Sequence, residues 1–321
     1  MEVKDVFQSY ILDCESRGLS KHTMRVYKQR LRHFSDFLSR KGVRDTEQLN
    51  ADHLRAFTVE LRQRDAHQFT NQKPNGRLVG TRTVFHYCRI IKSFGTWLVE
   101  QEILIRSPFA KVKLPRVERK LMPSLPTQDM VGIYDVIRKT GGERTIRDLA
   151  LYCFMLESGA RATEVIKLTL DDLYLDTYTA KVHGKGSKER LVCFTEKTAN
   201  LLRKYIEERP QVKVGEVFLN LQTGRPLTGN GLGQLVSKYG RRAGIHCYPH
   251  LLRHTFATRY LVNGDEKNLI SLQKLLGHAT LDMVRQYVNM LPVDVETQYK
   301  KFSPLNGLNL EEPAMVGSST K

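Results

Sequence analysis

The chain has 321 residues, and 51 Lys and Arg against 34 Asp and Glu give it a formal net charge of +17 at pH 7. With 40% hydrophobic and 26% charged residues, it has no uninterrupted apolar stretch near the roughly 18 residues that a membrane-spanning helix needs. The parts before and after residue 115 are both basic, at +9 and +8. Charge on both parts favours a protein that holds a polyanion such as nucleic acid from two sides, with generic solubility as the alternative.

The N-terminal residues carry scattered charges and lack the basic, apolar and small-residue succession of a signal peptide, which predicts a cytoplasmic protein. The five cysteines lie far apart, so their spacing supports neither a disulfide framework nor a Cys-x-x-Cys metal site. The acidic residues are not grouped as a two-metal nuclease requires. We therefore expect free thiols, no metal and no cofactor.

The first predicted elements are helices. Between residues 20 and 38, six apolar residues recur at spacings of three and four, which is one face of a helix. Ser20 is suited to cap its start, and Gly42 is suited to end it in a left-handed conformation. A second helical pattern begins at Asp52.

A polar segment with several Gly, Pro and Asn residues follows at 64–80 and predicts a loop. A third helix is predicted from Thr81 to Glu100, with a continuous apolar stripe along one side. Together these elements predict a small helical domain over residues 1–112. The third helix leaves three basic residues for its outer surface: Arg82, Arg89 and Lys92.

Prolines alternate with basic residues between positions 107 and 126, which is typical of a stiff connector that is solvated or lies along phosphates. We place a linker at 113–126. A second domain is expected over 127–303, and a loose tail over 304–321.

The second domain opens with helical patterns up to Ser158 and then changes character. Two short β-rich segments, 177–183 and 189–194, are joined by a glycine-containing turn that suits a hairpin. The expected fold is therefore mainly α with a small β-sheet. Helical patterns return at 195–208, 228–243, 249–263, 266–276 and 281–289.

Single residues in this domain are weak candidates for chemistry. Arg161 precedes the start of a predicted helix, where a surface ion pair is the more common role. Lys185 lies at the predicted hairpin tip, where a solvated lysine is common. His250 and Arg253 are spaced to lie on one helical face, where they could hold an anion or form a structural pair. His278 follows a glycine in a turn, and Tyr287 lies in an amphipathic segment where a core role is common.

The order and spacing of these residues carry more information. The segments SGARATEVIKL (158–168), GKGSKERLV (184–192), HLLRHTFAT (250–258) and LLGHAT (275–280), with Tyr287 nine residues after His278, resemble the tyrosine recombinase (phage integrase) family. Xer-type recombinases are the most similar members. The resemblance spans roughly residues 5–303.

The resemblance implies a helical, SAM-like N-terminal domain that binds the core site, and a mixed catalytic domain, which together form a clamp on DNA. It implies site-specific cleavage and rejoining of DNA strands through a 3′-phosphotyrosine on Tyr287. Lys185 would protonate the leaving 5′ oxygen, with Lys188 as the alternative. The partners implied are double-stranded DNA with inverted-repeat sites, a homotetramer on two sites, and a partner recombinase or accessory protein.

Physical chemistry suits these residues to phosphoryl transfer. Charge that develops on a phosphate is stabilised by fixed cationic donors, and the forked guanidinium groups of Arg161 and Arg253 match phosphate oxygens. His250 and His278 can add hydrogen bonds, and whether His250 also accepts the tyrosine proton stays open. Glu164 lies one helical turn after Arg161 and is suited to orient it, with a surface pair as the alternative.

Two other classes of protein fit parts of the pattern. A type IB topoisomerase or telomere-resolving enzyme uses similar chemistry, but the compact length and the Xer-like motifs argue against both. A DNA-binding protein on an inactive recombinase scaffold would have lost Tyr287 or one of the arginines, and none of these is missing. His254 matches a common family residue, and we interpret it as structural support.

Overall fold

The computed structural model describes residues 1–66, 74, 76–118, 124–142, 144–184, 189–262 and 268–277. The chain divides into two compact units between residues 120 and 121, inside the range predicted for the linker. The finer domain bounds stay predictions. Two expected segments, the helix at 281–289 and the tail at 304–321, lie outside the described residues.

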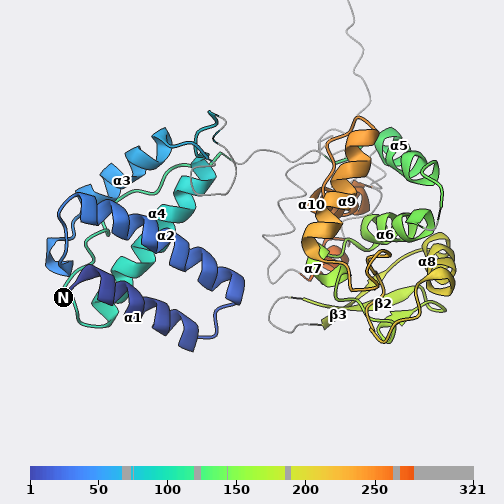
Figure 1. The fold of residues 1–321 in the computed structure, drawn as a ribbon, viewed down its shortest axis with the longest axis horizontal. Coiled ribbons are helices and arrows are strands. Elements are labelled where there is room, and N and C mark those ends of the chain that lie inside the picture. Colours follow the sequence, from blue (N-terminus) through green and yellow to red (C-terminus); the bar gives the residue numbers. More distant parts are fainter. Residues whose placement is uncertain are drawn as a thin grey trace, which may run out of the picture. The chain divides into compact units, whose positions relative to one another are not determined.

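The first unit is helical, and Figure 1 labels its four α-helices. Ser20 caps the second helix by accepting a hydrogen bond from the backbone N–H of Thr23 at 3.2 Å, and Gly42 follows its end with a φ of +75°. Asp65 pairs with Leu78 in an isolated bridge within the predicted loop. The elements are α1 (Val3–Ser16), α2 (Lys21–Arg40), the short 3₁₀ helix η1 (Thr46–Gln48), α3 (Ala51–Gln63) and α4 (Thr81–Glu100).

An aromatic cluster forms the core of the first unit. The ring of Phe34 is fully buried, and its centroid lies 5.1 Å from that of Phe57 and 5.8 Å from that of Phe109. Phe7 and Phe37 contact the same ring from α1 and from the next turn of α2. Burial of these large apolar surfaces holds the helices together.

One of the three basic residues expected on the outer surface of α4 makes specific contacts there. Lys92 is half-buried, and its Nζ donates hydrogen bonds to the carbonyl oxygens of Ala110 at 2.9 Å and Val112 at 2.6 Å. The long aliphatic stem allows the ammonium group to reach these carbonyls from α4. Lys92 therefore attaches the segment around Ala110 and Val112, which follows α4, to that helix.

The second unit combines helices with a three-stranded antiparallel sheet in the order β1-β2-β3. Ala180 lies opposite Val192 in the hairpin and opposite Leu173 in the outer pair, which confirms the predicted hairpin and adds the two-residue strand β1. The elements are α5 (Thr127–Arg138), α6 (Arg144–Ser158), α7 (Ala162–Val165), β1 (Leu173–Tyr174), β2 (Thr179–His183), β3 (Glu189–Cys193), α8 (Glu196–Glu208), α9 (Gly229–Arg242), α10 (Pro249–Val262) and α11 (Asn268–Leu276).

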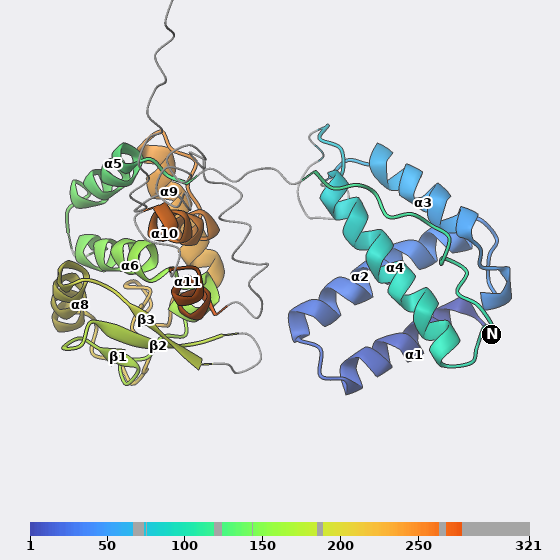
Figure 2. The same ribbon diagram turned by 180° about the vertical axis from the view of Figure 1, so that it is seen from behind.

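Helix α6 forms the centre of this unit and packs against α5, α8, α10 and β3 (Figure 2). The interior of the second unit holds charged as well as apolar groups. The Nε of Arg147 donates to Asp148 at 2.7 Å, and the hydroxyl of Tyr239 donates to the same carboxylate at 2.6 Å. Burial, and after it the hydrogen bond to Asp148, raises the pKa of Tyr239 to about 12.

None of the helices within the described ranges is both long and apolar enough to cross a membrane.

Candidate active site

Arg161 lies at a sharp turn between α6 and α7. Gly159 adopts a φ of +59°, and a Cβ added there would overlap the ring of Phe256, so the turn requires glycine. The Oγ of Ser158 accepts a hydrogen bond from the N–H of Ala160 at 3.2 Å and supports the same turn. Arg161 then caps the start of α7, and its side chain is 34% exposed.

Glu164 holds Arg161 at two points. One carboxylate oxygen accepts from the backbone N–H of Arg161 at 2.7 Å, and the other accepts from its guanidinium at 2.8 Å. Glu164 is only 1% exposed, so the surface-pair alternative is wrong for its carboxylate. Burial raises the pKa of Glu164, but the hydrogen bonds from Arg190 and Arg161 outweigh it and the net shift is downward. The carboxylate is therefore ionised at neutral pH.

Arg190 on β3 reaches the same carboxylate from the other side. Its two terminal nitrogens donate to the two oxygens of Glu164 at 2.7 and 2.8 Å, and its Nε donates to the carbonyl oxygen of Leu275 at 2.6 Å. Its side chain is 10% exposed. Arg190 is not among the site residues predicted from the sequence. The available signal was its position in the strand, because it shares a face with the buried Val192 and a buried arginine needs an anionic partner.

Helix α10 supplies Arg253 and His250. Arg253 is 2% exposed and donates to the carbonyl oxygens of Gly159 at 2.6 Å and Leu276 at 2.8 Å. His250 is exposed on the same helix. Although part of its surface reaches solvent, desolvation of the rest, and after it the nearby charges of Arg253, His254 and Arg161, lower the pKa of His250. His254 is 3% exposed, in keeping with the structural role expected of it.

These contacts bring together segments that lie far apart in the sequence. Arg253 joins α10 to the turn before Arg161 and to the last residue of α11. Arg190 joins β3 to Glu164 and to Leu275, the residue before the last one of α11. Four of the sequence motifs therefore converge on one place in the second unit.

Three predicted site residues lie outside the described residues: Lys185, His278 and Tyr287. The alternative lysine, Lys188, lies outside them as well. The residue before His278 is placed at this convergence. Gly277, which precedes His278, has a φ of +61°, and a Cβ added there would lie 3.0 Å from the Cδ of Arg190.

The strands that lead to Lys185 are fixed at the base of the hairpin. His183 contacts Asp172 through its Nε2 at 3.1 Å and Glu189 through its Nδ1 at 3.3 Å. Lys181 pairs with Asp172 at 3.1 Å from the same strand. These polar contacts hold the two strands at the point where the predicted turn begins.

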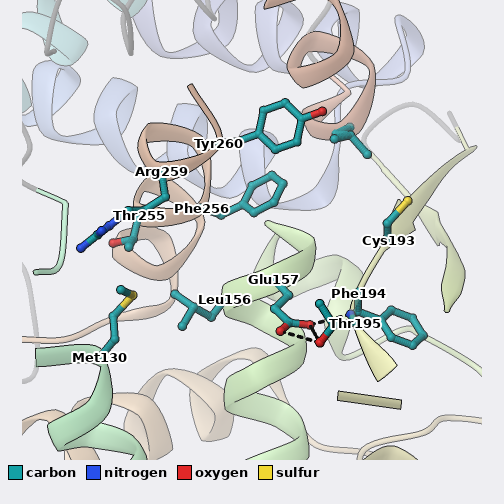
Figure 3. Close-up of a pocket in the computed structure, with 11 residues that line it drawn as sticks. Met130, Leu156, Glu157, Cys193, Phe194, Thr195, Thr255, Phe256, Arg259 and Tyr260 are labelled. Atoms are coloured by element: carbon teal, nitrogen blue, oxygen red, sulfur yellow. Dashed lines mark hydrogen bonds between the residues drawn. The ribbon is translucent and has the colours of Figure 1, made fainter. Parts of the chain in front are cut away.

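A separate apolar pocket of about 670 Å³ lies beside α10, between the end of α6 and the end of β3 (Figure 3). Leu156, Phe194 and Phe256 line it, while Glu157 accepts hydrogen bonds from the backbone N–H and the hydroxyl of Thr195 at its edge. Arg161, Glu164, His250 and Arg253 are not among its lining residues. The pocket is therefore distinct from the charged candidate site.

The chain matches two family models and many known proteins. The model of the phage integrase family matches residues 123–292, and that of the phage integrase N-terminal SAM-like domain matches residues 7–74. Tyrosine recombinase XerD of Listeria monocytogenes is 30% identical over 90% of this chain and 94% of that protein. Tyrosine recombinase XerC of Bacillus subtilis is 28% identical over 90% of this chain and 92% of that protein.

Solved structures agree with this fold. The Tn1549 transposon integrase in complex with transposon right end DNA has a TM-score of 0.72 and 18% identity, covering 94% of this chain and 99% of that one. The XerH site-specific recombinase bound to a palindromic difH substrate has a TM-score of 0.69 and 22% identity, covering 89% of this chain and 80% of that one. The chain belongs to the phage integrase family, and it is a tyrosine recombinase of the Xer-like type.

Proposed function

We propose that this tyrosine recombinase cleaves and rejoins DNA at specific sites through a 3′-phosphotyrosine on Tyr287. The observation that carries the proposal is the convergence of the motif segments around Arg161, which Glu164 holds with its guanidinium partly exposed. The solved relatives in complex with DNA support double-stranded DNA as the substrate. Inverted-repeat recombination sites remain part of this proposal.

In the proposed reaction, the phenol oxygen of Tyr287 attacks the phosphorus and the bond to the 5′ oxygen breaks. Lys185 gives the leaving oxygen a proton, which produces a free 5′-hydroxyl group. The phosphodiester bond is exchanged for a phosphotyrosine bond, so rejoining needs no ATP, and the chemistry we propose uses no metal. The proton of Tyr287 requires an acceptor, and His250 is suited to this because its lowered pKa keeps it neutral near pH 7.

Negative charge that develops on the phosphate requires fixed positive donors. Arg161 is the accessible cation of the described site, whereas Arg253 is buried and anchored to carbonyl oxygens. We propose that both arginines, with His250 and His278, stabilise the phosphate during the attack. Lysine cannot reproduce the forked geometry of a guanidinium, so Arg161→Lys is not a conservative change in this role.

Covalent capture tests the proposal. Wild type and Tyr287→Phe are incubated with a fragmented DNA library of the host, denatured, and the protein-linked strands are sequenced. We expect one enriched sequence attached through its 3′ phosphate in wild type, and no adduct in Tyr287→Phe, because phenylalanine lacks the nucleophile.

Tyr174→Phe is a suitable control, because Tyr174 is exposed on the short strand β1 and should leave the adduct unchanged. Equal adduct in wild type and Tyr287→Phe would refute the assignment of the nucleophile. Relaxation of any supercoiled plasmid without a preferred sequence would instead favour a topoisomerase, and hairpin ends would favour a telomere-resolving enzyme.

We also propose that the protein acts as a homotetramer on two DNA sites, with its two units forming a clamp, and that a partner recombinase or accessory protein takes part. The positive charge on both parts of the chain supports contact with DNA by each unit. The mass of the complex on the captured site gives the number of protomers, and a complex of one protomer per site that never pairs would contradict the tetramer.

A further inference from the structure

Arg190 connects the β-hairpin to the arginine that we propose to bind phosphate. The two oxygens of Glu164 each accept one hydrogen bond from Arg161 and one from Arg190, at distances between 2.7 and 2.8 Å. The carboxylate is 1% exposed, and the Arg190 side chain is 10% exposed. Water therefore screens these charges poorly, and each of them has a strong effect on the others.

The charges in this cluster do not cancel. A buried Glu164 paired with Arg161 alone would neutralise the guanidinium and draw it away from a bound phosphate. Arg190 adds a second positive charge to the same carboxylate, so the three groups together carry a net charge of +1. A site that binds a phosphodiester requires this surplus.

Arg190 is itself held in place. Its Nε donates to the carbonyl oxygen of Leu275 at 2.6 Å, and Gly277 lies against its aliphatic stem. The guanidinium is thus fixed at the end of α11 on one side and at Glu164 on the other. A guanidinium fixed in this way can hold the Glu164 carboxylate in one position, as outer hydrogen-bond partners do for ligands in metal sites.

We propose that Arg190 is a positioning residue for DNA cleavage, which acts through Glu164 to orient Arg161 and to keep the phosphate site positively charged. This inference rests on the proposed function. It assigns Arg190 no contact with DNA, and it predicts that its effect depends on the charge of Glu164.

The test measures single-turnover cleavage of a suicide substrate and, separately, equilibrium binding of the same DNA. Arg190→Met should slow cleavage about 10- to 100-fold and change binding less than about threefold, because the residue acts on the reacting geometry. Arg190→Lys keeps the charge but cannot bridge both oxygens, so we expect an intermediate rate. Arg203→Met is the matched control, because Arg203, on α8, forms an exposed pair with Asp176.

A double-mutant cycle identifies the route of action. Glu164→Gln alone should slow cleavage, and adding Arg190→Met to it should slow cleavage by no more than about threefold further. This double variant leaves no unpaired buried charge, so it should fold even where Arg190→Met does not, and thermal unfolding checks each variant. A full additional loss in the double variant, or wild-type cleavage by Arg190→Met, would overturn the proposal. A wild type that forms no adduct would instead refute the proposed function.

Discussion

The two units of this protein are stabilised by different interiors. The first unit packs phenylalanine rings against one another around Phe34, and its buried polar side chains are few among the described residues. The second unit buries charged groups, including Arg147, Asp148 and Glu164. Buried charges stabilise a fold poorly but fix geometry when they are fully paired. The difference indicates that the second unit, besides its apolar core, holds cations in defined positions by pairing them with buried carboxylates.

The sharpest way to test this comparison is to remove a buried charge from the second unit. Asp148→Leu leaves the guanidinium of Arg147 without its carboxylate, and we expect the free energy of unfolding to fall by about 3–5 kcal/mol. Arg147→Met combined with Asp148→Leu should lose less, because no charge is left unpaired. Denaturation followed by circular dichroism measures both, and equal losses would contradict the interpretation.

A smaller effect is expected from a change in the aromatic core of the first unit. Phe34→Leu keeps an apolar side chain but loses ring contacts, and we expect a loss of about 1–3 kcal/mol. Trp97, the single tryptophan, lies in the first unit, so its fluorescence reports the unfolding of that unit. Phe154→Leu in the second unit is the control and should leave the Trp97 transition unchanged. Equal shifts from the two variants would show that the units unfold together.

The smallest effect at neutral pH concerns a buried imidazole of the first unit. Burial, and after it the charge of Arg32, lowers the pKa of His33 to about 4, and its Nδ1 lies 2.7 Å from the hydroxyl of Tyr87. Between about pH 6.5 and 4 the unfolded chain binds a proton that the folded chain does not, so stability falls as the pH falls through this window.

This loss amounts to at most about 3 kcal/mol at the acid end and vanishes above the pKa of the unfolded state. Denaturation followed by Trp97 fluorescence from pH 8 to pH 4 should show a shallower pH dependence in His33→Gln than in wild type. Identical pH dependence in the two proteins would show that His33 does not titrate in this way.

Much of the fold could be predicted from the sequence because strong local signals agreed with tertiary packing. The helix at Thr81–Glu100 was predicted at its observed bounds, because its apolar stripe is continuous and Gly80 precedes its first residue. Helix α1 is not among the predicted helices, although Val3, Val6 and Tyr10 follow helical spacing, because charged and polar residues are scattered between them. Strand β1 has two residues, which is too short to show the alternation of apolar and polar residues that indicates a strand.

The candidate site was predictable where a residue type and a spacing together define a motif. Arg161, Glu164 and Arg253 were selected on that basis, and the structure brings their segments together. The link from Arg190 to Glu164 was not predictable in the same way, because it joins residues from a strand and a helix whose contact depends on the tertiary fold. A local pattern shows that an arginine faces inward but does not identify its partner.

The attachment of the end of α11 has a genetic consequence. Two hydrogen bonds from Arg190 and Arg253 hold it, and both are accepted by main-chain carbonyl oxygens, those of Leu275 and Leu276. Every amino acid has this oxygen, so no substitution at either position can delete the acceptor. Point mutations that delete a side-chain donor of these two hydrogen bonds must therefore fall in the codons of Arg190 or Arg253, upstream of the segment that the donors hold.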